Sequence, residues 1–167
     1  MTSPPSSPLT PLARLMTADG VLMEPCDADR SCNLDASMFK GIFCRNLRYL
    51  LDLTTNATRA AHYRTFLANN VRAVQRRASC SPGHGHRCHI VYLDGAPAFP
   101  ATGNTTQHTA VTRDTCPAPG PVFDTVWRGP FTQSRPIQQT SALDLLVAAS
   151  EAGVRCRGAG CSYDPAR

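Results

Sequence analysis

The sequence predicts an all-α chain in which helical hairpins are joined by long irregular loops. Apolar residues recur at three- and four-residue spacing in three separate stretches, which is the pattern of amphipathic helices. The 14 Pro and 11 Gly residues gather mainly between these stretches, where they favour turns and loops. The 167 residues suffice for one domain with a hydrophobic core.

The N-terminal residues 1–10 are rich in Pro and Ser, and we expect them to be disordered. Thr10 as an N-cap and Pro11 at the first helical position predict a short helix over residues 11–16. The following "GVLMEP" is typical of a short extended piece. This start lacks the apolar segment of a signal peptide. The sequence contains no run of about 18 apolar residues, so no membrane span is predicted.

The first long helix is predicted over about residues 36–53, with Asp35 as its N-cap. Gly41 inside this helix costs about 1 kcal/mol relative to Ala. Close approach of another helix or of a ligand would explain that cost. Lys40 has two interpretations, because it could pair with Asp35 one turn earlier or point into water. The apolar face of this helix consists of Phe39, Ile42, Phe43, Leu47, Leu50 and Leu51.

Two further helices are predicted over about residues 59–77 and 138–152. In the last helix, Ser141 followed three residues later by Asp144 resembles a capping box, and Gly153 suits the C-terminal end. The apolar stripe of the middle helix consists of Tyr63, Phe66, Leu67, Val71 and Val74.

The stretch between residues 80 and 136 is predicted to be mostly irregular, because Gly, Pro and Thr are frequent there. Within it, "CHIVYLDG" is consistent with a strand that enters a turn. The tail after Cys156 is predicted to be loop.

Eight cysteines form an even set, and three close pairs bracket short polar loops. Two N-glycosylation sequons begin at Asn56 and Asn104. Together these features favour an oxidising compartment and a secreted protein. The candidate disulfide pairs are Cys26/Cys32, Cys80/Cys88 and Cys156/Cys161.

The net charge of +5 comes mostly from arginine, and Lys40 is the only lysine. A nucleic-acid binder would concentrate its arginines on one face with aromatic residues between them. Here the arginines are scattered along the chain. The charge pattern therefore argues against nucleic acid as a partner.

The segment "CSPGHGHRCH" contains residues that could bind zinc. Its spacing fits no known zinc finger, so a Cys80–Cys88 disulfide that closes a His-rich loop is favoured. A small zinc-binding protein is retained as an alternative function, while no metal or cofactor is expected. The potential ligands are Cys80, His84, His86, Cys88 and His89.

Four stretches of the chain resemble glycoside hydrolase family 76, the α-1,6-mannanases and related fungal cell-wall enzymes. "EPC…CNLDASMFKGIFCRNLRYLLD" resembles the helix that opens the C-terminal part of that family. "HYRTFLANN", "VWRGPF" and "QQTSALDLLVAA" resemble later family segments in the same order. These four stretches cover most of the chain outside the loops.

The resemblance implies an (α/α)6 barrel, with twelve helices in two concentric rings. Residues 11–167 would form only the C-terminal part of such a domain, with a loop insertion at about residues 79–122. The implied activity is hydrolysis of internal α-1,6-mannosidic bonds, or transfer of a mannose-containing glycan to another sugar. The implied location of the parent protein is outside the cell or in the cell wall.

The catalytic pair of the family is two adjacent Asp residues, and this sequence contains no Asp-Asp. Glycoside hydrolysis needs two carboxylates that flank the scissile bond. No catalytic residue is therefore assigned, and we expect this chain alone to be inactive. A non-catalytic carbohydrate-binding or degenerate module is the alternative.

The resemblance also implies which residues face a mannose-containing polysaccharide or glycan. Inner helices of such barrels point polar and aromatic side chains at a central cleft. Asp35 and Lys40 would bond to sugar hydroxyls, Trp127 would stack on a sugar face, and Gln139 would be a polar cleft residue. Phe39 is a further candidate for substrate binding. For Phe39 and Trp127 the alternative is an ordinary place in the core.

Overall fold

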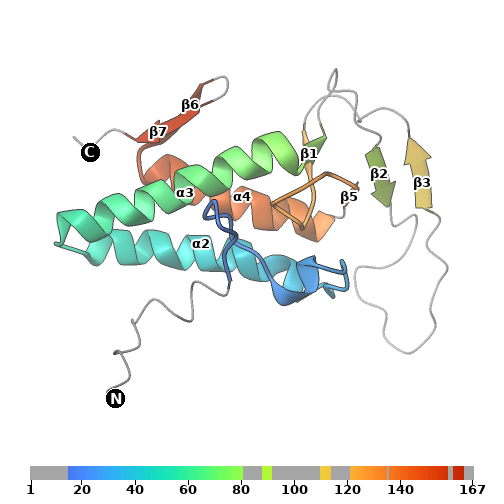
Figure 1. The fold of residues 1–167 in the computed structure, drawn as a ribbon, viewed down its shortest axis with the longest axis horizontal. Helices are drawn as coiled ribbons and strands as arrows, with labels where there is room; N and C mark the ends of the chain where they lie inside the picture. Colours follow the sequence, from blue (N-terminus) through green and yellow to red (C-terminus); the bar gives the residue numbers. More distant parts are fainter. Residues whose placement is uncertain are drawn as a thin grey trace, which may run out of the picture.

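The computed structural model describes the backbone of residues 15–80, 88–91, 110–113, 121–134, 136–157 and 160–163. The predicted disorder of residues 1–10, the sequon at Asn104 and the His84/His86 loop lie outside these residues. The described part is mainly helical (Figure 1). It contains the short 3-10 helix η1 (Pro25–Asp27) and the α-helices α2 (Ala36–Leu53), α3 (Ala57–Arg77) and α4 (Pro136–Glu151).

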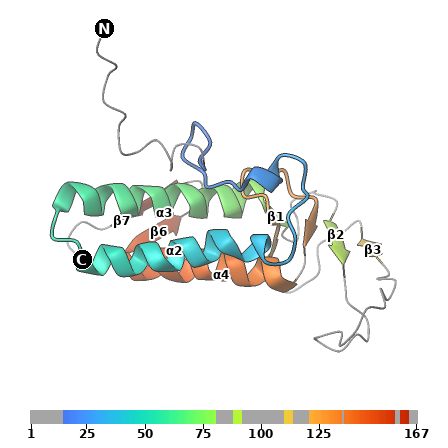
Figure 2. The ribbon, with the colours of Figure 1, turned by 90° about the horizontal axis from the view of Figure 1, so that it is seen from below.

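The three α-helices lie alongside one another (Figures 1 and 2). α2 and α3 form an antiparallel hairpin joined by a short turn, as the sequence predicts. α4 packs extensively against α2 and also contacts α3, whereas α2 and α3 contact each other less. The mostly helical fold class is thus confirmed, but the described residues do not form a closed barrel.

Short strands flank the helices. β1 (Ser79–Cys80) pairs antiparallel with β4 (Val122–Phe123). β2 (Cys88–Val91) lies between β3 (Ala110–Arg113), which is antiparallel to it, and β5 (Gln133–Ser134), which is parallel. β2 confirms the strand predicted in "CHIVYLDG", whereas the strand β3 lies in a stretch predicted to be irregular.

The C-terminal tail is not the loop that the sequence predicts. β6 (Val154–Arg157) and β7 (Gly160–Tyr163) form an antiparallel hairpin that packs on α3. Cys156 and Cys161 are directly opposite partners in this hairpin and form a disulfide. The cross-strand disulfide stabilises two strands that are too short to pair well by themselves.

The buried face of α2 differs from the predicted apolar face. Phe39 and Leu50 are 52% and 53% exposed. The missing side chain of Gly41 helps to decide the orientation, because it lets the backbone of α4 approach α2 closely at Ser141. The buried positions of α2 are Ser37, Lys40, Gly41, Cys44, Leu47 and Leu51.

The predicted helix caps are only partly right. Asp35 makes no side-chain cap hydrogen bond, and the Ala36 amide donates instead to Asn33 Oδ1 at 2.8 Å. α3 begins two residues before the predicted start, because the Asn56 side chain accepts a hydrogen bond from the Arg59 amide. α4 begins at Pro136, so Ser141 lies inside the helix and forms no capping box.

The segment before η1 forms a tight turn rather than the end of a helix. Met16 pairs with Leu22 in an antiparallel bridge. The buried Asn70 of α3 holds this turn, since its Oδ1 accepts from the Leu22 amide at 2.8 Å and its Nδ2 donates to the Gly20 carbonyl at 3.2 Å. The helix predicted over residues 11–16 is therefore wrong at its described end, where Met16 is extended.

Candidate functional site

The only lysine of the chain lies at the centre of a buried cluster. Lys40 is fully buried, and its Nζ donates to both carboxylate oxygens of Asp27, at 2.7 and 2.8 Å. The same Nζ lies 5.9 Å from the ring centroid of Trp127. Lys40 thus neither pairs with Asp35 nor points into water, and its buried ammonium group is bonded to Asp27 rather than open to a sugar hydroxyl.

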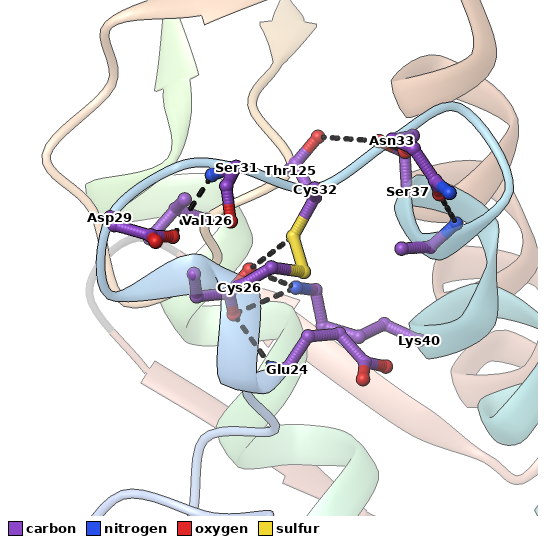
Figure 3. The surroundings of a disulfide bond; sticks show 12 residues. Glu24, Cys26, Asp29, Ser31, Cys32, Asn33, Ser37, Lys40, Thr125 and Val126 are labelled. Carbon is purple, nitrogen blue, oxygen red and sulfur yellow. Dashed lines mark hydrogen bonds and ion pairs between the residues drawn. A yellow bond between two sulfur atoms is a disulfide. The ribbon is translucent and has the colours of Figure 1, made fainter.

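The loop that carries Asp27 is held by a disulfide and by a hydrogen bond (Figure 3). Cys26 and Cys32 form one of the predicted disulfides and close a loop over η1. Asp27 Oδ2 also accepts from the Glu24 amide at 2.9 Å. The carboxylate therefore reaches Lys40 from a fixed position, which lowers the entropy lost when the ion pair forms.

A second buried carboxylate, Asp124, organises the segment that carries Trp127. Asp124 Oδ2 accepts from the Thr132 amide at 2.8 Å and forms an ion pair with Arg30 at 3.0 Å. Its Oδ1 accepts from the Val126 amide at 3.2 Å. These bonds fold residues 124–132 into a compact loop around one carboxylate.

Trp127 is fully buried in the core cluster, so its ring presents no face to a sugar. The loop that holds it comes very close to α3. A Cβ at Gly129 would lie 2.5 Å from the Arg77 carbonyl oxygen, and the φ of Gly129 is +71°. Of the two sequence interpretations of Trp127, the structure places it as a core aromatic.

Gln139 holds two elements together. Its Oε1 accepts from the Phe123 amide at 3.0 Å, and its Nε2 donates to the Phe123 carbonyl at 2.9 Å. The side-chain amide of α4 thereby mimics a strand partner for β4. These two bonds occupy the polar groups that a sugar hydroxyl would need.

Two of the predicted substrate-binding residues remain on the surface. Asp35 is exposed, and Phe39, one turn later on the same face of α2, is 52% exposed. The structure thus places Lys40, Trp127 and Gln139 in or beside the packed interior, and Asp35 and Phe39 at its edge.

The acidic residues near Lys40 show no arrangement for glycoside cleavage. Asp27 and Asp124 are both buried and each faces a cation. Glu24, beside this cluster, stays partly exposed. Burial raises the pKa of Glu24 above 4.5, although the charge of Lys40 opposes this shift. Burial also lowers the pKa of Lys40, and the Asp27 carboxylate opposes that change.

We expect Glu24→Gln to change how stability depends on pH. Because the pKa of Glu24 is raised by folding, the native state holds its proton more tightly than the unfolded state does. The contribution of Glu24 to the free energy of unfolding is therefore most favourable at acid pH, and it is lost as the pH rises from 4.5 through the native pKa. The stability of Glu24→Gln relative to the wild type should rise between pH 4 and pH 7, as urea unfolding at several pH values would show. A constant or falling difference would contradict this assignment.

Sequence reasoning missed the two buried carboxylates. Asp27 lies in the short loop between Cys26 and Cys32, and Asp124 lies three residues before Trp127. One signal could have found Asp27. A lysine beside a helix glycine is placed where another helix packs, and burying its charge is costly without an acidic partner. The loop closed by Cys26 and Cys32 holds Asp27 in a fixed position and can supply that partner.

One of the potential zinc ligands, Cys80, is disulfide-bonded and therefore cannot bind the metal as a thiolate. The part of the chain that the structure describes also contains no group of three His, Cys, Asp or Glu side chains placed to hold a metal ion. Its helices include none that is long and apolar enough to cross a bilayer.

No known protein family, curated protein or solved structure matches this chain. The cluster around Lys40 combines the buried Lys40–Asp27 ion pair, the partly exposed Arg30–Asp124 pair, a buried Trp and a close contact between two helices at the N-terminal half of α2.

Proposed function

We propose that this chain forms the C-terminal part of a glycoside hydrolase family 76 domain that acts on α-1,6-mannan. One observation carries the proposal. Three of the four stretches that resemble the family meet around Lys40, although they are far apart in the sequence. Asp27 pairs with Lys40, Trp127 lies beside its ammonium group, and Gly41 packs against Ser141.

The exposed apolar residues of α2 and α4 support the barrel. Contiguous apolar patches on a soluble protein mark surfaces that contact another element or partner. In an (α/α)6 barrel, neighbouring helices would cover these side chains. Apart from Phe39, the large exposed residues of the two helices are Tyr49, Leu50, Leu53, Leu143 and Val147.

In this proposal the turn of Asp35 and Phe39 contacts the glycan. The carboxylate of Asp35 would accept hydrogen bonds from sugar hydroxyls, and the exposed ring of Phe39 would pack on the apolar face of a mannose. Lys40 and Trp127 lie in the packed interior behind this turn, and Gln139 is bonded to β4, so none of the three touches sugar. The disulfides Cys26–Cys32 and Cys156–Cys161 suit the oxidising environment of a secreted or cell-wall protein.

The chain by itself is proposed to bind α-1,6-mannan without cleaving it. Cleavage requires an acid and a second carboxylate across the glycosidic bond, and the buried acids Asp27 and Asp124 each face a cation. In a complete domain, either water or a sugar hydroxyl would be the acceptor in the central cleft of the barrel.

Phe39→Ala should weaken binding of α-1,6-linked mannose oligosaccharides about tenfold, since an aromatic contact contributes roughly 0.5–1.5 kcal/mol beyond its buried area. Isothermal titration calorimetry with the purified, oxidised chain measures this. Leu50→Ala is the matched control, because Leu50 is equally exposed on the same helix but far from Asp35. That control should bind like the wild type.

A reducing-sugar assay on α-1,6-mannan accompanies the titration and should detect no turnover. Equal affinity of Phe39→Ala and Leu50→Ala would refute the assigned contact. Absence of any binding by the wild type would refute carbohydrate recognition by this chain, and clear turnover would refute its inactivity.

A further inference from the structure

A groove of about 780 Å³ lies between α2 and α3, beside the turn formed by residues 15–24. Its volume is within the roughly 300–1,000 Å³ typical of small-molecule sites. Its apolar wall includes Phe43 and Phe66, whose rings meet edge to face with centroids 5.7 Å apart. Its polar border includes Asn56, Arg59 and His62.

Asn56 stands at the rim of this groove and begins the sequon Asn56-Ala57-Thr58. Asn56 and Thr58 are both exposed, in and just after the turn that joins α2 to α3. This turn follows the C-terminal end of α2, whereas Lys40 lies near the N-terminal end of that helix. Figure 1 shows the turn at one end of the α2–α3 hairpin. An exposed turn is the structural setting in which an Asn-X-Thr sequon accepts a glycan.

The hydrogen bonds of Asn56 are compatible with modification. Its Oδ1 accepts from the Arg59 amide at 2.9 Å and caps α3. N-glycosylation uses the other atom of the amide, Nδ2, and leaves the carbonyl oxygen in place. The cap of α3 would therefore survive the modification.

We propose that Asn56 carries an N-linked glycan whose first sugars cover the groove between α2 and α3. In the reaction, Nδ2 forms a bond to C1 of an N-acetylglucosamine. The bond from that C1 to a lipid diphosphate breaks, the diphosphate leaves with its electron pair, and Nδ2 loses one proton. The co-reactant is a lipid-diphosphate-linked oligosaccharide of the secretory pathway.

The groove fits this occupant because its residues continue along α3 from the attachment point. Asn56, Arg59, Tyr63 and Phe66 follow at spacings of three and four residues, so they lie on one face of the helix. Tyr63 and Phe66 offer ring surface to the apolar face and acetyl group of a sugar. Arg59 and the neighbouring His62 offer hydrogen-bond donors to its hydroxyls.

The cellular setting required by the proposal agrees with the cysteines. Cys26–Cys32 and Cys156–Cys161 are disulfides, which form in the compartment where N-glycans are attached. The proposal does not depend on mannan binding, since the Asp35–Phe39 turn is at the other end of α2.

The test is secretion of the full chain from insect cells, with Thr58→Ala and Thr58→Ser made in parallel. Thr58→Ala destroys the sequon and keeps the Asn56 cap, whereas Thr58→Ser keeps both. Peptide mapping with and without peptide-N-glycosidase shows whether Asn56 carries a glycan, separately from the sequon at Asn104. We expect a glycan on the wild type and on Thr58→Ser, and none on Thr58→Ala.

Dye binding and amide hydrogen exchange of the same three proteins measure whether the glycan covers the groove. Without the glycan, Thr58→Ala should bind a hydrophobic dye with about twofold higher fluorescence and exchange the amides of residues 59–69 faster. An unoccupied Asn56 in both wild type and Thr58→Ser would overturn the modification site. If loss of the glycan changes neither dye binding nor amide exchange, the glycan does not cover the groove. A dimer of Thr58→Ala in light scattering would show that a second copy covers the groove, and this result too would overturn the proposal.

Discussion

Lys40→Met is expected to lower the free energy of unfolding by about 3–5 kcal/mol, because it leaves the buried carboxylate of Asp27 without its cation. Asp27 would retain only its bond from the Glu24 amide. Chemical denaturation under non-reducing conditions measures the loss. The fluorescence of Trp127, the only tryptophan, reports on this same cluster.

Two further variants separate the ion pair from general effects of mutation. Arg77→Met removes a surface partner of Asp19, and it should cost no more than about 1 kcal/mol. Lys40→Met combined with Asp27→Asn removes both charges and should recover at least part of the loss, because no uncompensated charge stays buried. A loss for Lys40→Met as small as that for Arg77→Met would show that the pair is not a centre of stability.

Gly41→Ala is expected to destabilise the fold by about 2–3 kcal/mol, although alanine is the better helix former by about 1 kcal/mol. The new Cβ would lie 2.6 Å from both the Cα and the carbonyl oxygen of Ser141. Both are backbone atoms of α4, so the two helices must separate to admit the methyl group. Denaturant unfolding measures the change.

The identity of the contacted atoms allows a sharper test of this helix contact. Asn46→Ala, at an exposed position of α2, should be neutral or stabilise by about 0.5 kcal/mol. Adding Ser141→Gly to Gly41→Ala should give no rescue, because the clash is with the backbone and because Ser141 Oγ accepts a bond from the Gly41 amide. Rescue by Ser141→Gly would mean that the side chain, not the backbone, sets the distance.

The cost of Gly41 in its helix now has a physical explanation. The sequence offered two reasons, a neighbouring helix or a ligand, and the structure shows the helix. α4 lies so close at this point that only glycine fits. The same closeness turns α2 so that Lys40 is buried while Phe39, an apparent core residue, reaches the surface.

Local patterns predicted the elements well where they depend on neighbours in the sequence. Helices α2 and α3 follow from apolar spacing, and Cys26–Cys32 and Cys156–Cys161 follow from short polar loops between cysteines. The β6–β7 hairpin was missed because its strands are short and their pairing depends on the disulfide. The cap predicted at Asp35 was wrong, since Asn33 accepts from the first amide of α2 instead, and the cap that Asn56 forms for α3 was not predicted.

The sequence by itself determined the three helices, two disulfides and the resemblance on which the proposed function rests. Only the tertiary structure decided which side chains are buried, because burial depends on the contact between α2 and α4, 100 residues apart at Gly41 and Ser141. It placed Asp27 on Lys40 and enclosed Trp127, while Asp35 and Phe39 were left at the surface. Periodicity defines an apolar face, but the closest packing of backbones determines how the helix is turned.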